Sequence, residues 1–309
     1  KTLRNHRQSI FKCILWLFWA MAAVPTSAAR YDGLDACELS ALNGRVTTEA
    51  RCGELSVPEN PNQSAGADNV IELAFAVLPA RSGEGLPDPV FFLAGGPGQS
   101  ARDVAPIMAR ALRDINAERD LVFLDQRGTG ESNALDCAID EEYTDWLNPK
   151  LEGAAESILE CLDQWPADVR FYTTTDAAND LEQLREHLGF EQINLIGGSY
   201  GTRLGQVYMK AHPDRVRSAI LDGVAPMRLA LGAEHGPNLD RALEALIAAC
   251  QAEQACSDAF PDLDEAFVDL KNAYPSWVDG PRITITHPRL GEALQITFSR
   301  TVLATALRF

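Results

Sequence analysis

The chain has 309 residues, of which 46% are hydrophobic and 23% charged, a balance typical of globular rather than disordered proteins. Its formal net charge is −17. The charged residues of the segment 1–29 are all Lys or Arg, so the net charge of the rest of the chain is still more negative. Such a chain repels phosphate backbones, which excludes nucleic acid as an expected partner. The length suffices for one large domain or two small ones.

The N-terminus has the pattern of a secretory signal peptide. Residues 1–12 hold all the cations of this segment, residues 13–29 carry no charge, and small residues precede Arg30. This pattern predicts cleavage after Ala28 or Ala29 and a secreted or periplasmic protein. The alternative is an uncleaved membrane anchor, although the apolar run is just short of a comfortable span. We expect membrane contact only through this segment.

In chain order from residue 69, the patterns of apolar residues predict alternating strands and helices. The elements are a strand at 69–80, a strand at 89–94, a helix at 102–117, a strand at 120–124, a helix at 176–188, a strand at 192–196, a helix at 200–211, a strand at 216–221, mostly helical residues over 239–273, a hairpin of 283–286 with 294–298, and the first turns of a helix at 301–309. Strands separated by helices indicate an α/β fold with a mostly parallel sheet. Functional residues of such sheets lie where strands end.

The six cysteines after residue 29 form three pairs of close neighbours in the sequence. An even number of cysteines in an exported chain indicates disulfides. Proximity alone favours the pairs Cys37–Cys52, Cys137–Cys161 and Cys250–Cys256. No Cys-x-x-Cys motif occurs and the five histidines are scattered, so we expect neither a bound metal nor a cofactor.

The strongest motif is Gly197–Gly201 (GGSYG), between the strand predicted at 192–196 and the helix predicted at 200–211. It matches the G-x-S-x-G nucleophile elbow, in which a serine occupies a sharp, strained turn from strand to helix. Only small residues fit two positions before and after that serine. The helix N-terminus favours a developing negative charge. Ser199 is therefore the candidate nucleophile.

A second turn, Gly95–Gly98 (GGPG), follows the apolar run at 89–94. Its ordinary interpretation is a Gly/Pro loop. Its functional interpretation is that a backbone N–H of this turn joins that of Tyr200 as an oxyanion donor, because glycine lets the main chain approach a substrate carbonyl. No Lys-Ser or Lys-Thr follows, and no G-x-G-x-x-G is completed, so phosphate and dinucleotide loops are not expected.

A third turn, Asp125–Ser132 (DQRGTGES), follows the strand predicted at 120–124. We expect Asp125 and Arg127 to brace one another near the mouth of the sheet. A structural role is favoured over a catalytic one, because interior ion pairs are commonly part of the scaffold.

These three turns, in this order, resemble those of α/β-hydrolases of the prolyl-aminopeptidase and tripeptidyl-aminopeptidase type. That family has a Gly-Gly-Pro-Gly loop, a D-x-R-G-x-G-x-S stretch and a G-G-S-[YW]-G elbow. His212–Val216 and Leu221–Val224 are also similar to it. The cysteines, the N-terminal segment and the long insert between Ser132 and Phe171 resemble the exported tripeptidyl-aminopeptidase branch.

The resemblance implies a domain organisation. After a signal peptide at 1–29, residues 30–234 would form the N-terminal part of an α/β-hydrolase core with a mostly parallel sheet. Residues 235–309 would begin a helical cap with a hairpin. Such a cap covers the site and binds the amine of the substrate.

The resemblance also implies an aminopeptidase. Ser199 would attack a peptide carbonyl near a free N-terminus and release short N-terminal pieces or tripeptides through an acyl-enzyme, while the N–H groups of Gly96 and Tyr200 hold the oxyanion. The expected partner is thus a peptide with a free N-terminus. Many prolyl aminopeptidases have His before the Gly-Gly-Pro-Gly loop, where this chain has Ala94, so strict proline specificity is not expected.

The acid and histidine of the triad should follow the serine, in the chain order Ser, acid, His. Only one convincing parallel strand, 216–221, is predicted after Ser199. We therefore expect the acid and the histidine to lie beyond Phe309, so that the chain is C-terminally truncated, lacks the last strands and is inactive by itself.

The histidines within the chain have ordinary interpretations. His187 and His212 lie near predicted helix ends, and His235 and His287 lie in loop-like stretches. A rival interpretation takes Asp222 as the acid with His235 or His287 as the base. Neither histidine follows a strand in the way that triad geometry requires.

Two other functions stay open on the sequence alone. Esterases and lipase-like hydrolases use the same machinery, and the elbow does not exclude them. A hydrolase fold can also serve as a non-catalytic binding protein, although a strained serine turn has little structural use. The oligomeric state has no signature in the sequence.

Overall fold

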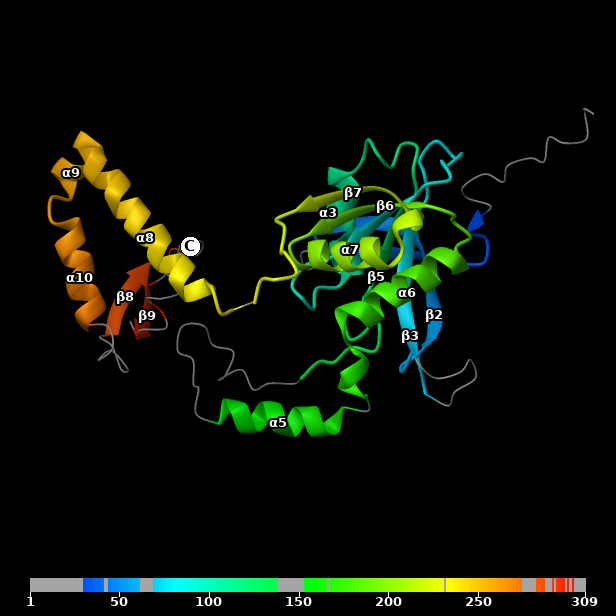
Figure 1. Cartoon of the computed structure of the whole chain (residues 1–309), viewed down its shortest axis with the longest axis horizontal. Helices are drawn as coiled ribbons and strands as arrows, with labels where there is room; N and C mark the ends of the chain where they lie inside the picture. The colour runs from blue at the N-terminus through cyan, green and yellow to red at the C-terminus, as the bar shows by residue number, and fades with distance from the viewer. Residues whose placement is uncertain are drawn as a thin grey trace, which may run out of the picture. The chain divides into compact units, whose positions relative to one another are not determined.

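The computed structural model describes residues 30–41, 44–61, 69–137, 153–165, 167–230, 232–273, 282–286, 291, 293–297, 299 and 302. The chain divides into two compact units, Lys1–Leu135 with Asp168–Met227 and Asp136–Ala167 with Arg228–Phe309 (Figure 1). The expected signal segment 1–29, His287 and nearly all of the helix expected at 301–309 lie outside the described residues. The boundary expected between residues 234 and 235 stays a prediction.

Unit 1 contains a seven-stranded sheet in the order β1-β2-β3-β5-β4-β6-β7. Its strands are β1 (Asp35–Ala41), β2 (Val46–Pro58), β3 (Val70–Leu78), β4 (Val90–Leu93), β5 (Leu121–Leu124), β6 (Ile193–Gly198) and β7 (Val216–Asp222). The pairs β1–β2, β2–β3 and β3–β5 are antiparallel, whereas β5, β4, β6 and β7 run parallel. The sheet is therefore mixed, and the carboxyl ends of its parallel strands meet at one edge.

Helices cover both faces of this sheet (Figure 1). They are α3 (Ala101–Ala111), α6 (Thr174–His187) and α7 (Tyr200–Ala211), with the 3-10 turns η1 (Val169–Phe171) and η2 (Pro213–Arg215). Helix α3 packs in one core with Phe92 and Phe123, whereas α6 and α7 pack in the other with Phe91 and Val122. Because successive side chains of a strand point to opposite faces, the buried strands feed two apolar cores at once.

Strands β1 and β2 are absent from the sequence-based expectations. Their sequences are rich in Glu, Thr and Ser, and only a few of their side chains are buried. The apolar pattern that predicts a strand is therefore weak in both. Their antiparallel pairing, with Cys37 opposite Ala50, and the disulfide between Cys37 and Cys52 hold them in the sheet.

Helix α3 ends at Ala111, earlier than the end predicted at residue 117, and turns follow it. The side-chain amide of Asn116 donates to the carbonyl oxygens of Leu78, Pro79 and Arg119, at 3.2, 3.3 and 3.1 Å. Buried carbonyls need such partners. The turn after α3 brings Asn116 to these carbonyls, which a pattern of apolar residues cannot reveal.

Unit 2 is mostly helical. Its elements are α5 (Ala154–Gln164), α8 (His235–Ala252), α9 (Gln254–Ala259), α10 (Leu263–Ala273) and the hairpin of β8 (Arg282–Thr286) with β9 (Ala293–Thr297). The hairpin expected from the sequence is confirmed, whereas His235 begins a helix and does not lie in a loop. Among the described helices of the whole chain, none is long and apolar enough to cross a membrane.

Three disulfides join the cysteines that are neighbours in the sequence. Their Cα atoms are 5.9, 5.7 and 5.1 Å apart, which is the usual range for a disulfide. The pairs are Cys37–Cys52, Cys137–Cys161 and Cys250–Cys256. Disulfides are usual in proteins of oxidising compartments, and this pattern is consistent with an extracellular location.

Arg127 forms a buried ion pair with Asp180 of helix α6. Its Nε and Nη2 donate to the two carboxylate oxygens, each at 2.7 Å, and its Nη1 donates to the carbonyl oxygens of Glu59 and Phe171. Burial raises the pKa of the Asp180 carboxyl, and the bonds from Arg127 oppose that rise. The expected brace between Asp125 and Arg127 is therefore wrong, because each of the two residues has other partners.

Replacing Asp180 by alanine leaves the Arg127 guanidinium buried without its anion. We expect Asp180→Ala to lower the free energy of unfolding of the full chain by about 3–5 kcal/mol, measured by urea denaturation followed by circular dichroism. Arg170→Ala is the matched control, because the Arg170 side chain that pairs with Asp168 is 79% exposed. Its unfolding midpoint should stay near that of the wild type. Equal losses in the two variants would contradict a bracing role for the buried pair.

Candidate active site

Ser199 occupies the turn between strand β6 and helix α7. Its backbone has φ 51° and ψ −118°, a conformation that residues other than glycine rarely adopt. Backbone strain of this kind costs about 1–3 kcal/mol and persists only where the surroundings impose it. The residue is exposed to solvent, so a strained serine stands open at the carboxyl end of β6.

Two glycines make this turn possible. A methyl group on Gly197 would lie 2.6 Å from the carbonyl oxygen of Gly201, and one on Gly201 would lie 2.6 Å from the carbonyl carbon of Leu93. Both distances are far below any real contact. At Gly198, in contrast, an added methyl meets nothing within 4 Å. The G-x-S-x-G spacing is thus a steric requirement at 197 and 201, where backbone meets backbone.

Hydrogen bonds to the end of β7 hold the turn. The N–H of Ser199 donates to the carbonyl oxygen of Asp222 at 2.8 Å. The Thr202 hydroxyl donates to the carbonyl of Ser199 at 2.6 Å and accepts from the N–H of Ala225 at 2.8 Å. Asp222, the acid of the rival interpretation, thus contributes its main-chain carbonyl to the turn. Because the N–H of Ser199 donates to this carbonyl, that N–H is not available to a substrate.

The Gly95–Gly98 loop lies against this turn. A methyl on Gly95 would be 3.3 Å from the Cβ of Ser199, so the two motifs meet without a side chain between them. The N–H of Gly95 already donates to Oε1 of Gln99 at 3.2 Å. The next amide along the loop is that of Gly96, an exposed residue with φ 101°. The structure therefore brings the predicted residues Gly96 and Ser199 to the same edge of the sheet.

Tyr200 is the first residue of helix α7. The first amides of a helix have no intrahelical acceptor, so its N–H is directed to the space before the helix. Its side-chain hydroxyl bonds with the hydroxyl of Thr174, at the start of α6, at 2.6 Å. Thr174 has no signature in the sequence, because no motif links it to the elbow.

The third turn supports the second. Asp125 accepts hydrogen bonds from the Ser100 hydroxyl at 2.8 Å and from the backbone N–H groups of Arg102 and Glu131 at 3.0 and 3.2 Å. Ser100 is the N-cap of α3. Since α3 begins just after the Gly95–Gly98 loop, Asp125 holds the far end of that loop. The role of Asp125 is structural, as expected, but its partners are Ser100, Arg102 and Glu131 and not Arg127.

The described histidines of unit 1 lie away from Ser199. Ser199 and His212 flank the two ends of helix α7, whose 12 residues span about 18 Å. The rings of His187 and Phe75 pack edge to face with centroids 6.1 Å apart. Within the described residues, the Ser199 hydroxyl makes no side-chain hydrogen bond, and no group of three or more His, Cys, Asp or Glu could hold a metal ion.

The comparison with known families agrees with this geometry, since residues 88–308 match the model of the alpha/beta hydrolase fold. The chain belongs to the α/β-hydrolase fold family. In α/β-hydrolases the strand–turn–helix position of Ser199 is the nucleophile elbow, and the amide after the serine is an oxyanion donor.

The α/β-hydrolases most similar to this chain include peptidases. Serine protease Hip1 of Mycobacterium tuberculosis is 30% identical over 206 residues, which cover 60% of this chain and 38% of that protein. Tripeptidyl aminopeptidase of Streptomyces coelicolor is 28% identical over 226 residues, 66% of this chain and 40% of that protein. Proline iminopeptidase of Arabidopsis thaliana is 34% identical over 146 residues, 47% of this chain and 29% of that protein. The chain thus spans less than half the length of these relatives.

A single methyl group at position 201 should disturb the whole elbow. We expect Gly201→Ala to lower the free energy of unfolding by roughly 1–3 kcal/mol, because the methyl would clash with backbone atoms of Leu93 and Ala94 and not with the flexible end of a side chain. Gly198→Ala is the matched control, with a change of about 0.5 kcal/mol or less. Thermal unfolding of both variants measures the difference. A Gly201→Ala protein as stable as Gly198→Ala would refute the close contact.

Proposed function

We propose that this α/β-hydrolase is a serine hydrolase that acts as an exported aminopeptidase and releases short N-terminal pieces or tripeptides from peptides. The observation that carries the proposal is the strained, exposed Ser199 with the Gly95–Gly98 loop packed against its Cβ. A fold keeps such strain where the serine must project toward a substrate. Non-catalytic binding has no use for it.

The chemistry follows from the groups around Ser199. In the proposed reaction, Oγ attacks the substrate carbonyl and its proton passes to a histidine base. The N–H groups of Tyr200 and Gly96 hold the oxyanion of the tetrahedral intermediate. The C–N bond then breaks, and the shortened peptide leaves with the proton on its new amino group. The N-terminal residues of the substrate stay bound to Ser199 as an ester. Water hydrolyses this ester and restores the serine.

In this proposal the histidine base and its orienting acid come from residues that the structure does not describe. The described histidines of unit 1 support this, since His212 lies at the far end of α7 and His187 packs on Phe75. Turnover of the full-length protein should therefore survive His235→Ala, since His235 begins helix α8 and is among the described residues. Turnover lost on His235→Ala would instead support the rival triad with Asp222.

The class of substrate rests on similarity and charge. Relatives include a tripeptidyl aminopeptidase and a proline iminopeptidase. A chain with a net charge of −17 attracts the ammonium group of a free peptide N-terminus. The three disulfides and the signal-like segment 1–29 favour export.

Ser199→Ala should abolish both turnover and labelling by a fluorophosphonate probe in the full-length protein. The probe forms its bond only with an activated serine, so labelling reports the nucleophile directly. Ser132→Ala is not a suitable control, because that buried hydroxyl bonds the backbone of Ala74 and Asp125. The exposed Ser82→Ala variant should label like the wild type. Labelling that persists in Ser199→Ala would overturn the assignment.

Purified protein should then cleave tripeptidyl or aminoacyl amides with a free N-terminus, and lose activity when that N-terminus is acetylated. Acyl esters offer the same carbonyl without the ammonium group. If only esters are hydrolysed, the peptidase proposal fails while the serine hydrolase survives.

A further inference from the structure

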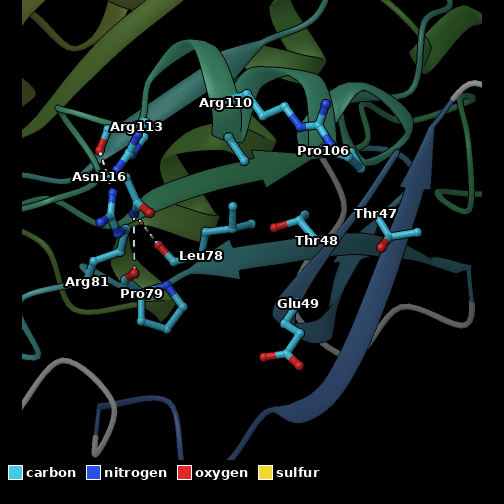
Figure 2. A pocket seen from close by; sticks show the side chains of 11 residues that line it. Thr47, Thr48, Glu49, Leu78, Pro79, Arg81, Pro106, Arg110, Arg113 and Asn116 are labelled. Atoms are coloured by element: carbon cyan, nitrogen blue, oxygen red, sulfur yellow. Dashed lines mark hydrogen bonds between the residues drawn. The ribbon is translucent and has the colours of Figure 1, made fainter. Parts of the chain in front are cut away.

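Unit 1 has a cavity of about 430 Å³ far from Ser199 (Figure 2). Its walls come from the start of β2, the end of β3, the C-terminal half of α3 and the turn after it. Leu78, in its wall, pairs with Leu121 at the beginning of β5, whereas Leu93 and Gly197 mark the edge of the elbow. The cavity therefore lies at the opposite edge of the sheet and has no place in the proposed reaction.

Three arginines line this cavity, namely Arg81, Arg110 and Arg113. All three are exposed, and none takes part in the ion pairs found among the described residues. Glu49 is the one acidic side chain in the lining. In a chain with a net charge of −17, this is a local excess of positive charge.

The dipole of helix α3 does not explain why three arginines gather near its C-terminus. A helix C-terminus carries about half a negative charge, which one nearby cation offsets. Arg110 already lies in the last turn of α3. Arg81 and Arg113 add two further positive charges beside it. Uncompensated cations of this kind repel one another unless an anion binds between them.

The arginines form two groups in the lining, which also contains apolar residues. Figure 2 shows Arg81 and Arg113 beside Asn116, while the Arg110 side chain extends toward Pro106. Nη1 of Arg81 donates to the main-chain carbonyl oxygen of Arg113 at 3.5 Å, which places the Arg81 side chain beside residue 113. Leu78, Pro106 and Ala109 contribute apolar surface to the same lining. A ligand that fits both groups needs two separated anionic groups on a short apolar body.

Hydrogen bonds of Asn116 shape the wall of the cavity. The amide of Asn116 donates to the carbonyls of Leu78, Pro79 and Arg119, which joins the turn after α3 to the end of β3. Asn116 therefore shapes the wall and does not serve the ligand. The hydroxyl groups of Thr47 and Thr48 add further donors at the β2 side.

We propose that this cavity binds a small dicarboxylate, with one carboxylate on Arg81 and Arg113 and the other on Arg110. Guanidinium groups match carboxylates with paired N–H donors. Two singly charged carboxylates are repelled by the acidic chain less than two phosphates, which carry more charge at neutral pH. The site is independent of the function proposed for Ser199.

Adipate is the probe, and hexanoate, which has the same length and one carboxylate, is its matched control. Isothermal titration calorimetry of the full chain at low salt should detect adipate binding, with hexanoate weaker by about tenfold or more. Arg113→Gln and Arg110→Gln should each weaken adipate binding by about tenfold. Arg45→Gln removes the same charge from an exposed residue outside the lining and should leave binding unchanged.

The outcomes separate cleanly. No heat from adipate at low salt, or equal affinity for adipate and hexanoate, overturns the proposal. An equal effect of Arg45→Gln and Arg113→Gln also overturns it, because binding would then follow net charge alone. Fluorophosphonate labelling of Ser199 tests the other proposal and does not depend on these results.

Discussion

Helix α7 meets strand β4 at Gly201 with no side chain between the two backbones, and the rest of the site depends on this contact. A methyl there would lie 2.6 Å from the carbonyl carbon of Leu93 and 2.8 Å from the carbonyl oxygen of Ala94. Because α7 approaches so closely, the chain has to turn within one residue after β6, and Ser199 takes the strained conformation. The chain leaving β4 at Ala94 then passes directly beside Ser199 as the Gly95–Gly98 loop. One steric constraint thus places both the candidate nucleophile and its candidate oxyanion donor.

The groups that surround Ser199 in the described structure are mostly backbone groups. Its N–H is held by the carbonyl of Asp222, and Gly95 and Gly201 exclude side chains from its vicinity. Backbone dipoles fixed by a sheet and a helix do not need to reorganise when charge develops, which is how a preorganised oxyanion site works. The charged residues of the third turn act one step further away. Asp125 holds the start of α3.

Two acidic residues illustrate how burial and partners decide the behaviour of a charge in this acidic chain. Asp180 is buried with Arg127, and its carboxylate accepts two hydrogen bonds from that guanidinium. Asp168 forms its pair with Arg170 at the surface, where solvent weakens the interaction. The same contrast applies to cations. Arg127 is buried and paired, whereas Arg110 and Arg113 are exposed at a cavity and take part in none of the ion pairs among the described residues.

Local sequence was enough for everything that depends on a few neighbouring residues. The glycine spacing at 197–201 predicted the elbow, because the motif describes a backbone shape that only small residues permit. Apolar runs predicted the strands β3 to β7, of which β7 is largely exposed, and the amphipathic patterns predicted α6 and α7 to within a few residues. Tertiary structure decided what depends on residues distant in the chain. It paired Arg127 with Asp180 rather than Asp125, ended α3 where Asn116 reaches the carbonyls of β3, and added β1 and β2, whose polar sequences become strands only when paired. A hydrogen-bond partner 53 residues away has no signature in a local pattern, because the topology of the sheet alone brings the two groups together.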